Sequence, residues 1–227
     1  MKARRRAIVA GDLFRLRFIM AADLSPDART AVYVLSRSDL AANRDAMELF
    51  VVDIDSGRSR LLVEDPAMIG SPSFSADGRA LAFMSMRSGA PQIFVIPAAG
   101  GEVVQLTSLR RGVGGGPVWS PDGKRIAFTA GKQGEPRDPA KPYRVSRTIW
   151  RADGVGLIDD AIQQIHVVDA AGGEARALTD DAALNHSPVW TADSQGLIYA
   201  AAFDPVAAPM ATTLRIVIQS SIAAFCA

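Results

Sequence analysis

The sequence is poor in the residues that most often carry chemistry or bind metals. It contains one cysteine, Cys226, and two histidines, His166 and His186, among 227 residues. A lone cysteine forms neither an intramolecular disulfide nor a cysteine-based zinc site. The glycine-rich stretch 112–116 lacks the Lys-Ser/Thr ending of a phosphate-binding loop and precedes a predicted strand instead of a helix. The sequence therefore predicts no metal site and no cofactor.

Strong charge and long apolar runs are also missing. The net charge is +1, which creates no overall field for attracting nucleic acid or an anionic membrane. No segment approaches the roughly 18 uncharged apolar residues of a membrane-spanning helix. The basic first residues are followed by an apolar run over 7–10, shorter than the core of a secretory signal, about 7 to 15 residues. We expect a soluble, cytoplasmic protein with neither nucleic acid nor a membrane as partner.

Near the amino terminus, residues 12–20 have apolar side chains at helical spacing, with Asp12 as a potential cap. This pattern predicts a short helix. A membrane anchor of this length would bind weakly, so packing of the helix on the rest of the fold is the favoured interpretation.

What the sequence does contain is a repeated phrase of five residues. It occurs at Phe74–Gly78, Trp119–Gly123 and Trp190–Ser194, with a decayed copy at Leu24–Ala28. Aspartate in such a phrase bonds the backbone two residues on, and glycine accepts the left-handed conformation of a tight turn. Asp77 and Asp122 are therefore interpreted as structural residues of chain reversals and not as catalytic groups.

Two apolar runs follow each of the first three phrases, rich in the β-branched and aromatic residues that favour strands. The first runs cover 31–34, 81–84, 126–129 and 197–200, and the second cover 49–52, 93–96 and 165–168. Each second run leads into a glycine turn, and a last short strand ends at Leu106-Thr107 or Leu178-Thr179. The repeating unit is therefore four antiparallel strands.

The spacing of the units predicts a β-propeller. Successive aspartates of the phrase are 50, 45 and 71 residues apart, and propeller repeats span about 40 to 50 residues. We expect an N-terminal leading segment at 1–21 followed by a partial propeller at 22–227. Its blades are predicted at 22–64, 71–107, 117–179 with an insert at 131–162, and 187–227, the last incomplete. About four blades leave open sheet edges, which predicts self-association.

The repeat resembles a known family. The phrase followed by Ile/Leu-Ala-Phe, Ile-Phe-Val, Gly-Gly-Glu and Leu-Thr is similar to the propeller repeat of TolB-type proteins and of the amino-terminal domains of prolyl oligopeptidase family serine peptidases. Two stretches, 12–18 with the phrase at 24–27 and the insert segment 147–156, look like the acylaminoacyl-peptidase and dipeptidyl-peptidase branch. The resemblance covers residues 12–203.

The resemblance implies a propeller that gates the access of peptides to an α/β-hydrolase domain. Family members carry a G-x-S-x-G nucleophile motif followed by an aspartate and a histidine, and this chain contains no G-x-S-x-G. The chain alone is therefore expected to be non-catalytic, with a hydrolase domain as partner. The alternative is a TolB-like scaffold that holds a peptide or protein partner.

The long insert is the candidate interaction surface. Residues 132–151 have a local charge of +4 and include Arg144, Arg147, Trp150 and Arg151. Arginine and tryptophan are favoured at interfaces, and strand alternation places His186 on the same face of a propeller. We interpret these residues as a docking or substrate-channel surface, with a solvated loop as the alternative. His166 occupies the place of Phe50 and Phe94 in the other repeats, so it is expected to be a packed strand residue.

Overall fold

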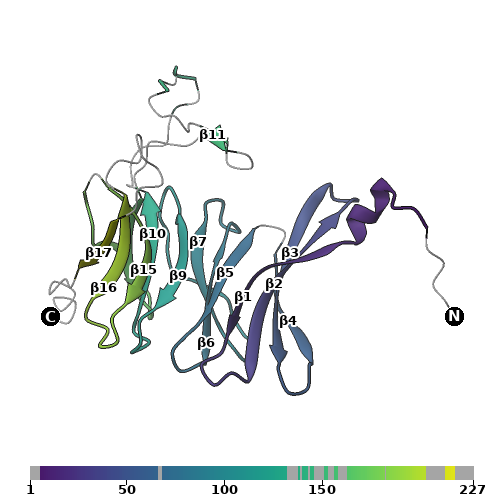
Figure 1. The fold of residues 1–227 in the computed structure, drawn as a ribbon, viewed down its shortest axis with the longest axis horizontal. Coiled ribbons are helices and arrows are strands. Elements are labelled where there is room, and N and C mark those ends of the chain that lie inside the picture. The colour runs from purple at the N-terminus through teal and green to yellow at the C-terminus, as the bar shows by residue number, and fades with distance from the viewer. Residues whose placement is uncertain are drawn as a thin grey trace.

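The computed structural model describes residues 6–65, 68–131, 138, 140–142, 144–145, 151–152, 156–157, 163–181, 183–202 and 213–217. In this part of the chain the sheets lie side by side in a row, from β1–β4 at one end to β15–β17 at the other (Figure 1). The predicted all-β architecture of four-stranded antiparallel blades is confirmed.

The described elements comprise one 3₁₀ helix and seventeen strands. They are η1 (Ala10–Arg15), β1 (Arg17–Leu24), β2 (Thr30–Asp39), β3 (Arg44–Asp53), β4 (Ser59–Asp65), β5 (Ile69–Phe74), β6 (Ala80–Ser85), β7 (Gln92–Pro97), β8 (Val104–Gln105), β9 (Gly115–Trp119), β10 (Arg125–Gly131), β11 (Arg151–Ala152), β12 (Gly156–Leu157), β13 (Gln163–Asp169), β14 (Arg176–Ala177), β15 (Leu184–Trp190), β16 (Leu197–Ala202) and β17 (Thr213–Val217).

Four of the sheets are blades, each with its strands in chain order from one edge to the other. Blade 1 is β1–β4, blade 2 is β5–β8, blade 3 is β9, β10, β13 and β14, and blade 4 is β15–β17. The two short strands β11 and β12 pair with each other inside the insert of blade 3. Among the described residues there is no helix long and apolar enough to cross a membrane.

The repeated phrase forms the same turn in every blade. In blade 2 the Ser75 hydroxyl donates to Asp77 Oδ1 at 2.6 Å and accepts the backbone N–H of Ala80 at 2.9 Å. The Arg79 N–H also donates to Asp77 Oδ1, at 3.0 Å. The hydrogen bonds that Asp77 accepts lower its pKa, and the bond from the Ser75 hydroxyl has the largest effect. The structural role predicted for Asp77 is confirmed, because its carboxylate oxygen is used to close the turn.

The innermost strand of blades 2, 3 and 4 contains a bulge at an X-Pro pair, namely Ser71-Pro72, Gly116-Pro117 and Ser187-Pro188. Proline has no N–H for the ladder, and a bulge is one of the few places where a strand accommodates it. Each strand is also paired on the amino-terminal side of its bulge. The strands therefore begin at Ile69, Gly115 and Leu184, upstream of the starts expected at 71, 117 and 187.

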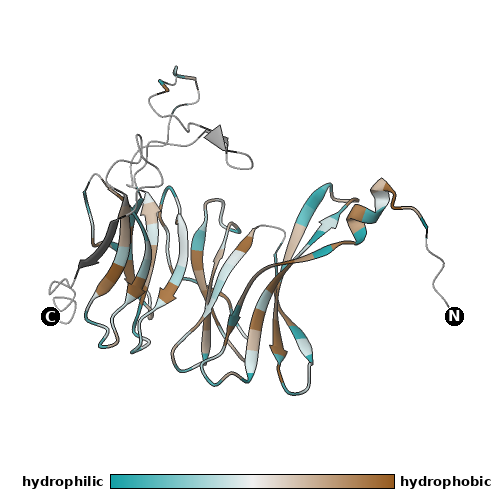
Figure 2. Cartoon of the chain, in the orientation of Figure 1, coloured by the Kyte–Doolittle hydropathy of each residue, from teal (hydrophilic) through white to brown (hydrophobic). Residues whose placement is uncertain are grey.

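Alternate residues of each strand face opposite neighbours, and the core lies between the blades. We call the face that packs on the preceding blade the front face and the other the back face. The back face of blade 1 meets the front face of blade 2 in one buried cluster. Blades 2 and 3, and blades 3 and 4, enclose two further clusters. Figure 2 shows the hydrophobic residues that recur along these strands.

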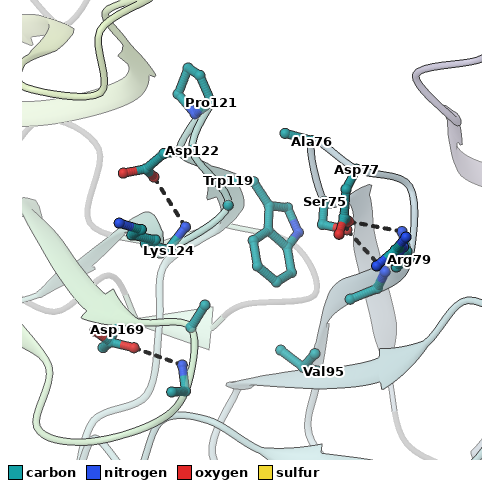
Figure 3. A pocket seen from close by; sticks show the side chains of 14 residues that line it. Ser75, Ala76, Asp77, Arg79, Val95, Trp119, Pro121, Asp122, Lys124 and Asp169 are labelled. Atoms are coloured by element: carbon teal, nitrogen blue, oxygen red, sulfur yellow. Dashed lines mark hydrogen bonds between the residues drawn. The ribbon is translucent and has the colours of Figure 1, made fainter.

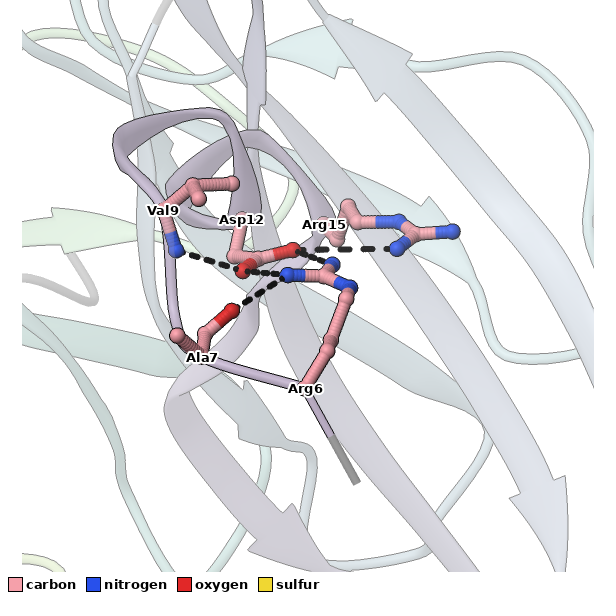
Figure 4. A network of polar contacts seen from close by, with 5 residues as sticks. All are labelled: Arg6, Ala7, Val9, Asp12 and Arg15. Carbon is pink, nitrogen blue, oxygen red and sulfur yellow. Dashed lines mark hydrogen bonds and ion pairs between the residues drawn. The ribbon is translucent and has the colours of Figure 1, made fainter. Parts of the chain in front are cut away.

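The leading segment differs in part from the prediction. A short helix is present, but it covers Ala10–Arg15, and β1 begins at Arg17. Leu13 and Met20 are both more than half exposed, so the expected apolar helical face packed on the fold is wrong. Asp12 holds the segment together by accepting the Val9 N–H at 3.0 Å and pairing with Arg6 (Figure 4). The bond from Arg6 lowers the pKa of Asp12 to about 2.

We predict that Gly116→Ala destabilises the junction of blades 2 and 3. A Cβ at Gly116 would lie 2.2 Å from Ser71 Cβ on the neighbouring bulge, and overpacking of this kind costs about 1–3 kcal/mol. Ser71 has a φ of 49°, so Ser71→Gly both removes the obstructing side chain and suits the backbone. Urea unfolding of the two single variants and the double variant measures the coupling.

The matched control is Gly123→Ala, where φ is 69° and a Cβ meets nothing within 4 Å. Gly123→Ala should lower the free energy of unfolding through backbone strain alone, and by the same amount with and without Ser71→Gly. Equal losses from Gly116→Ala with and without Ser71→Gly would contradict the close approach of the two bulges.

Candidate functional site

The candidate site lies at the end of the blades that carries the insert. The strand β10 runs from its turn to Gly131, where it pairs with Gln163 at the start of β13. The strand β15 begins at the same end, because Gln164 Nε2 donates to the Ala183 carbonyl at 3.4 Å. In Figure 1 the short strand β11 lies beyond these strand ends, opposite the turns of the repeated phrase. His186 is the third residue of β15 and so lies near this end of its strand; that His186 and the insert form one surface stays a prediction.

The predicted site residues fall in three situations. Arg144 is exposed in the insert, and Arg151 opens β11, where it pairs with Leu157. Arg147 and Trp150 lie outside the described residues. His186 lies within β15, opposite Ala200 of β16, although the fourth blade was expected to begin only at residue 187.

The polar partner of His186 is its neighbour in the chain. His186 Nδ1 lies 3.0 Å from Ser187 Oγ, and Ser187 is exposed with a φ of 53°. Few non-glycine residues adopt this left-handed backbone, and here the bulge at Pro188 imposes it. The contact joins two side chains of one bulge and does not bring His186 to an arginine of the insert.

His166 is a packed strand residue, as predicted. It lies in β13, is buried, and stacks on Phe128 with ring centroids 5.5 Å apart. Its Nδ1 lies 3.2 Å from the Gln164 carbonyl oxygen. Burial lowers the pKa of His166 below its ordinary value, and the bond to Gln164 opposes this only in part. The side chain is therefore part of the core and takes no part in the candidate site.

Beneath the insert end lies a buried polar network that sequence reasoning missed. Gln164 Oε1 accepts the Thr179 hydroxyl at 2.6 Å and Asn185 Nδ2 at 3.1 Å, and Thr179 Oγ1 accepts the Ile165 N–H at 3.0 Å. Blade 2 repeats it with Gln92, whose Oε1 accepts the Thr107 hydroxyl at 2.8 Å. The available signal was the glutamine that precedes the second apolar run in two repeats, matched to the threonine of each Leu-Thr ending.

Tryptophans tie blade 3 to blade 2 and blade 4 to blade 3, which the sequence analysis also missed. Trp119 Nε1 donates to the Ser73 carbonyl at 3.1 Å, and Trp190 Nε1 donates to the Val118 carbonyl at 2.9 Å. The Arg125 guanidinium lies 5.0 Å from the Trp190 ring centroid and donates to the Ser194 carbonyl at 2.5 Å. These contacts fix the angle between neighbouring blades.

At the opposite end, a groove of about 790 Å³ separates the turns of blades 2 and 3. Figure 3 shows Trp119 between the turn of Asp122 and Lys124 and the turn of Asp77 and Arg79. The two carboxylates each accept a backbone N–H of their own turn, at 3.0 and 3.1 Å. Since these groups already close the turns, the groove has the character of a blade junction and not of a reaction centre.

Over the described part of the chain, no three histidine, cysteine, aspartate or glutamate side chains gather as metal ligands would. The described site thus offers exposed charge and apolar surface for binding, together with one histidine and one serine that bond each other.

Four-stranded sheets that pack face to face in sequence define a β-propeller. The chain belongs to the PD40 family of TolB beta propeller domains, whose model matches residues 16–139. The resemblance stated from the repeat is therefore confirmed.

Similar proteins include peptidases. The chain is 28% identical over 206 residues to the uncharacterized peptidase YuxL of Bacillus subtilis, a match that covers 87% of this chain and 31% of that protein. It is 38% identical over 70 residues to dipeptidyl-peptidase 5 of Porphyromonas gingivalis, covering 31% of this chain and 10% of the relative. The acylaminoacyl peptidase of Pyrococcus horikoshii superposes with a TM-score of 0.63 at 17% identity, over 82% of this chain and 28% of that one. The chain spans less than a third of these relatives and corresponds to their propeller region.

We predict that His166→Phe flattens the dependence of stability on pH. Because the pKa of His166 is lowered in the folded state, the unfolded chain binds more protons at acidic pH, and stability falls as the pH drops below about 6.5. Phenylalanine holds the same place in blades 1 and 2 and does not titrate. Urea unfolding between about pH 7 and pH 5 should show a smaller loss of stability in the variant.

The reciprocal change, Phe94→His, puts a histidine at the matching buried place of blade 2 and should steepen the same dependence. Identical pH profiles for the wild-type chain and His166→Phe would show that burial of the imidazole does not govern its protonation.

Proposed function

We propose that this chain is the propeller portion of a prolyl-oligopeptidase-family serine peptidase, which restricts the access of peptides to an α/β-hydrolase domain. The observation that carries the proposal is the match to a peptidase over 206 residues, 87% of this chain. The branch-like segments at 12–18 and 147–156 support it. Residence in the cytoplasm is part of the same proposal.

The insert end is the side that we propose to face the hydrolase domain. We assign to this surface the exposed Arg144, Arg151 at the start of β11 and His186 on β15, together with Arg147 and Trp150 of the insert, which lie outside the described residues. The opposite end offers less to a partner, because the carboxylates of its turns are bonded to backbone N–H groups of those turns. A partner with an acidic surface would gain charge complementarity at the insert end.

We predict that the purified chain does not hydrolyse chromogenic amides or esters of acyl-amino acids and dipeptides, and that a fluorophosphonate probe does not label it. A Ser-His-Asp triad needs a histidine positioned on the serine by a third group. Here His166 is buried against Phe128, and the hydrogen bond of the His186 side chain in the described structure is with the adjacent Ser187. Mass spectrometry measures labelling.

Stoichiometric labelling would contradict the non-catalytic assignment. Ser187→Ala then serves as the discriminating variant, since it is the exposed serine with a histidine nitrogen at hydrogen-bond distance. Labelling that survives this change would point to another serine.

The docking proposal predicts that the chain binds the part of the Bacillus peptidase that lies outside the matched region. Arg144→Ala with Arg151→Ala should weaken this binding at least about tenfold, or ~1.4 kcal/mol, as loss of charged interface contacts does. Isothermal titration calorimetry measures the dissociation constants. The double variant Arg147→Ala with Trp150→Ala tests the remainder of the surface in the same way.

The matched control removes two exposed arginines at the opposite end, Arg58→Ala with Arg79→Ala, and should leave the dissociation constant unchanged. If the two double variants raised the dissociation constant equally, the effect would come from the loss of net positive charge and not from a specific surface at the insert end. Absence of binding by the wild-type chain would overturn the docking proposal.

A TolB-like scaffold is the second candidate function. The specific observation that favours it is the match of the TolB beta propeller model to residues 16–139. In that case the same open face holds a protein partner that is not a hydrolase. A chain that fails to bind the peptidase remainder but retains a protein partner sensitive to the insert variants would support this alternative.

A further inference from the structure

An arginine fills the space between the turns of blades 3 and 4. Arg125 is the first residue of β10 and is 9% exposed. Its guanidinium lies 5.0 Å from the centroid of the Trp190 ring and donates a hydrogen bond to the Ser194 carbonyl at 2.5 Å. The Ser194 hydroxyl accepts the backbone N–H of Asp122 at 3.0 Å. The side chains of Arg125 and Ser194 together close this junction at the end of the blades opposite the insert.

The junction of blades 2 and 3 has the same backbone but lacks both of these side chains. Ala80 opens β6 as Arg125 opens β10, and the N–H of each donates to the serine hydroxyl of its own turn, at 2.9 and 3.0 Å. Gly123 holds the place of Ser194, with a φ of 69° where Ser194 has 61°. The arginine and serine of one junction are thus replaced by an alanine and a glycine at the other.

The tryptophan is present at both junctions. Trp119 Nε1 donates to the Ser73 carbonyl and Trp190 Nε1 to the Val118 carbonyl, and these carbonyls hold equivalent places in blades 2 and 3. The two rings are therefore held in the same way. In the described part of the chain a cation lies over the Trp190 ring and none lies over the Trp119 ring.

The open space at the junction of blades 2 and 3 is the groove of about 790 Å³, and we call it the junction groove. Ala80, Gly123 and Trp119 all line it, and Figure 3 shows Trp119 between the two turns. A Cβ at Gly123 would meet nothing within 4 Å. The junction groove therefore lies where Arg125 and Ser194 lie at the next junction.

Blade 2 also lacks the arginine with which blade 1 reaches its neighbour. Arg60 on β4 pairs with Val51, lines the groove between blades 1 and 2, and donates to the Ala98 carbonyl of blade 2 at 3.2 Å. The equivalent residue of blade 2 is Val104, which pairs with Val95 on β7. At these two places the preceding blade supplies an arginine to a neighbouring junction, but blade 2 supplies none to the junction groove.

We propose that the junction groove binds an arginine side chain of a partner polypeptide, in the position that Arg125 takes at the next junction. The guanidinium lies against the Trp119 ring and donates to the Gly123 carbonyl, while its methylene stem lies on Ala80 and Val95. The proposal is independent of the function proposed above.

The carboxylates that line the junction groove favour a bound cation. Asp77, Asp122 and Asp169 each accept a backbone N–H of their own turn through Oδ1, which leaves Oδ2 for a guanidinium. Arg79 and Lys124 also line the groove, but both are exposed on the turns, where solvent screens their charge. Arginine suits the groove better than lysine, because a planar guanidinium stacks on a ring and donates to a carbonyl at the same time.

The extent of the groove favours a polypeptide over a free guanidinium compound. A second hollow of about 470 Å³ continues the junction groove, since Ala80 and Val95 line both. Val104 lines this second hollow and is 54% exposed. Apolar residues that flank the arginine of the partner can therefore contact Val104.

The test is the binding of acetyl-Ala-Arg-Ala amide to the 227-residue chain, followed through the indole N–H resonances in two-dimensional NMR spectra. Trp119→Phe assigns the Trp119 resonance, which the peptide is expected to shift. The citrulline peptide has a neutral urea in place of the guanidinium and should bind at least about tenfold more weakly, because it loses the cation–π attraction. Free arginine lacks the flanking residues and should also bind more weakly than the arginine peptide.

Ala80→Arg fills the junction groove from within the chain. Because the added side chain repeats Arg125, this variant should bind the peptide at least about tenfold more weakly and unfold at a higher urea concentration than the wild-type chain. The matched control is Ala42→Arg, in the exposed turn between β2 and β3, which adds the same charge away from the groove. It should bind the peptide like the wild-type chain.

Three results would each overturn the proposal: a Trp119 resonance that does not respond to the peptide, equal binding of the arginine and citrulline peptides, or an Ala80→Arg chain that folds and binds like the wild type. Free arginine that binds as tightly as the peptide would overturn a polypeptide as the partner. The comparison of the arginine and citrulline peptides uses the wild-type chain, so it decides the matter even where a variant fails to fold.

Discussion

The blades depend on one another for the burial of the sheet faces that lie between them. A four-stranded sheet whose alternate residues are apolar on each side is stable only when a neighbour covers each face. The three clusters between the blades meet this need at the three junctions, and a stacked ring pair on the second and third strands lies on the front face of blades 1, 2 and 3. The tryptophan bonds and the bulged inner strands follow from the same constraint, since they set how closely successive sheets approach.

The sequence predicts the parts of the fold that repeat. The phrase with aspartate at its fourth place specifies a turn whose bonds are local, so the same chemistry gives the same geometry in four blades. The apolar runs specify strands because they are short, continuous and rich in β-branched and aromatic residues, as in strands that are buried on both faces; every residue of β10 is buried. His166 could be placed as a core residue for the same reason, by comparison with Phe50 and Phe94 in the sister repeats.

The contacts between repeats could not be predicted in the same way. The bond from Trp190 to the Val118 carbonyl depends on the angle between two blades, which no single repeat encodes. Blade 4 was expected to begin at residue 187, whereas the bulge at Ser187-Pro188 allows the pairing of β15 to continue on both sides of it. The leading segment was misjudged because Asp12 and Arg6 stabilise a short turn of helix locally, without burying its apolar side chains.

The polar groups of this chain are mostly used to build it. The turn carboxylates accept backbone N–H groups, the buried glutamines bind the threonines that close each blade, and His166 is stacked in the core. Such groups cannot also bind and transform a substrate without giving up those bonds. What the described structure leaves free is surface: the cationic insert end and the groove between the turns of blades 2 and 3. This use of the polar groups agrees with the proposed role, in which the chain acts by binding and positioning a partner.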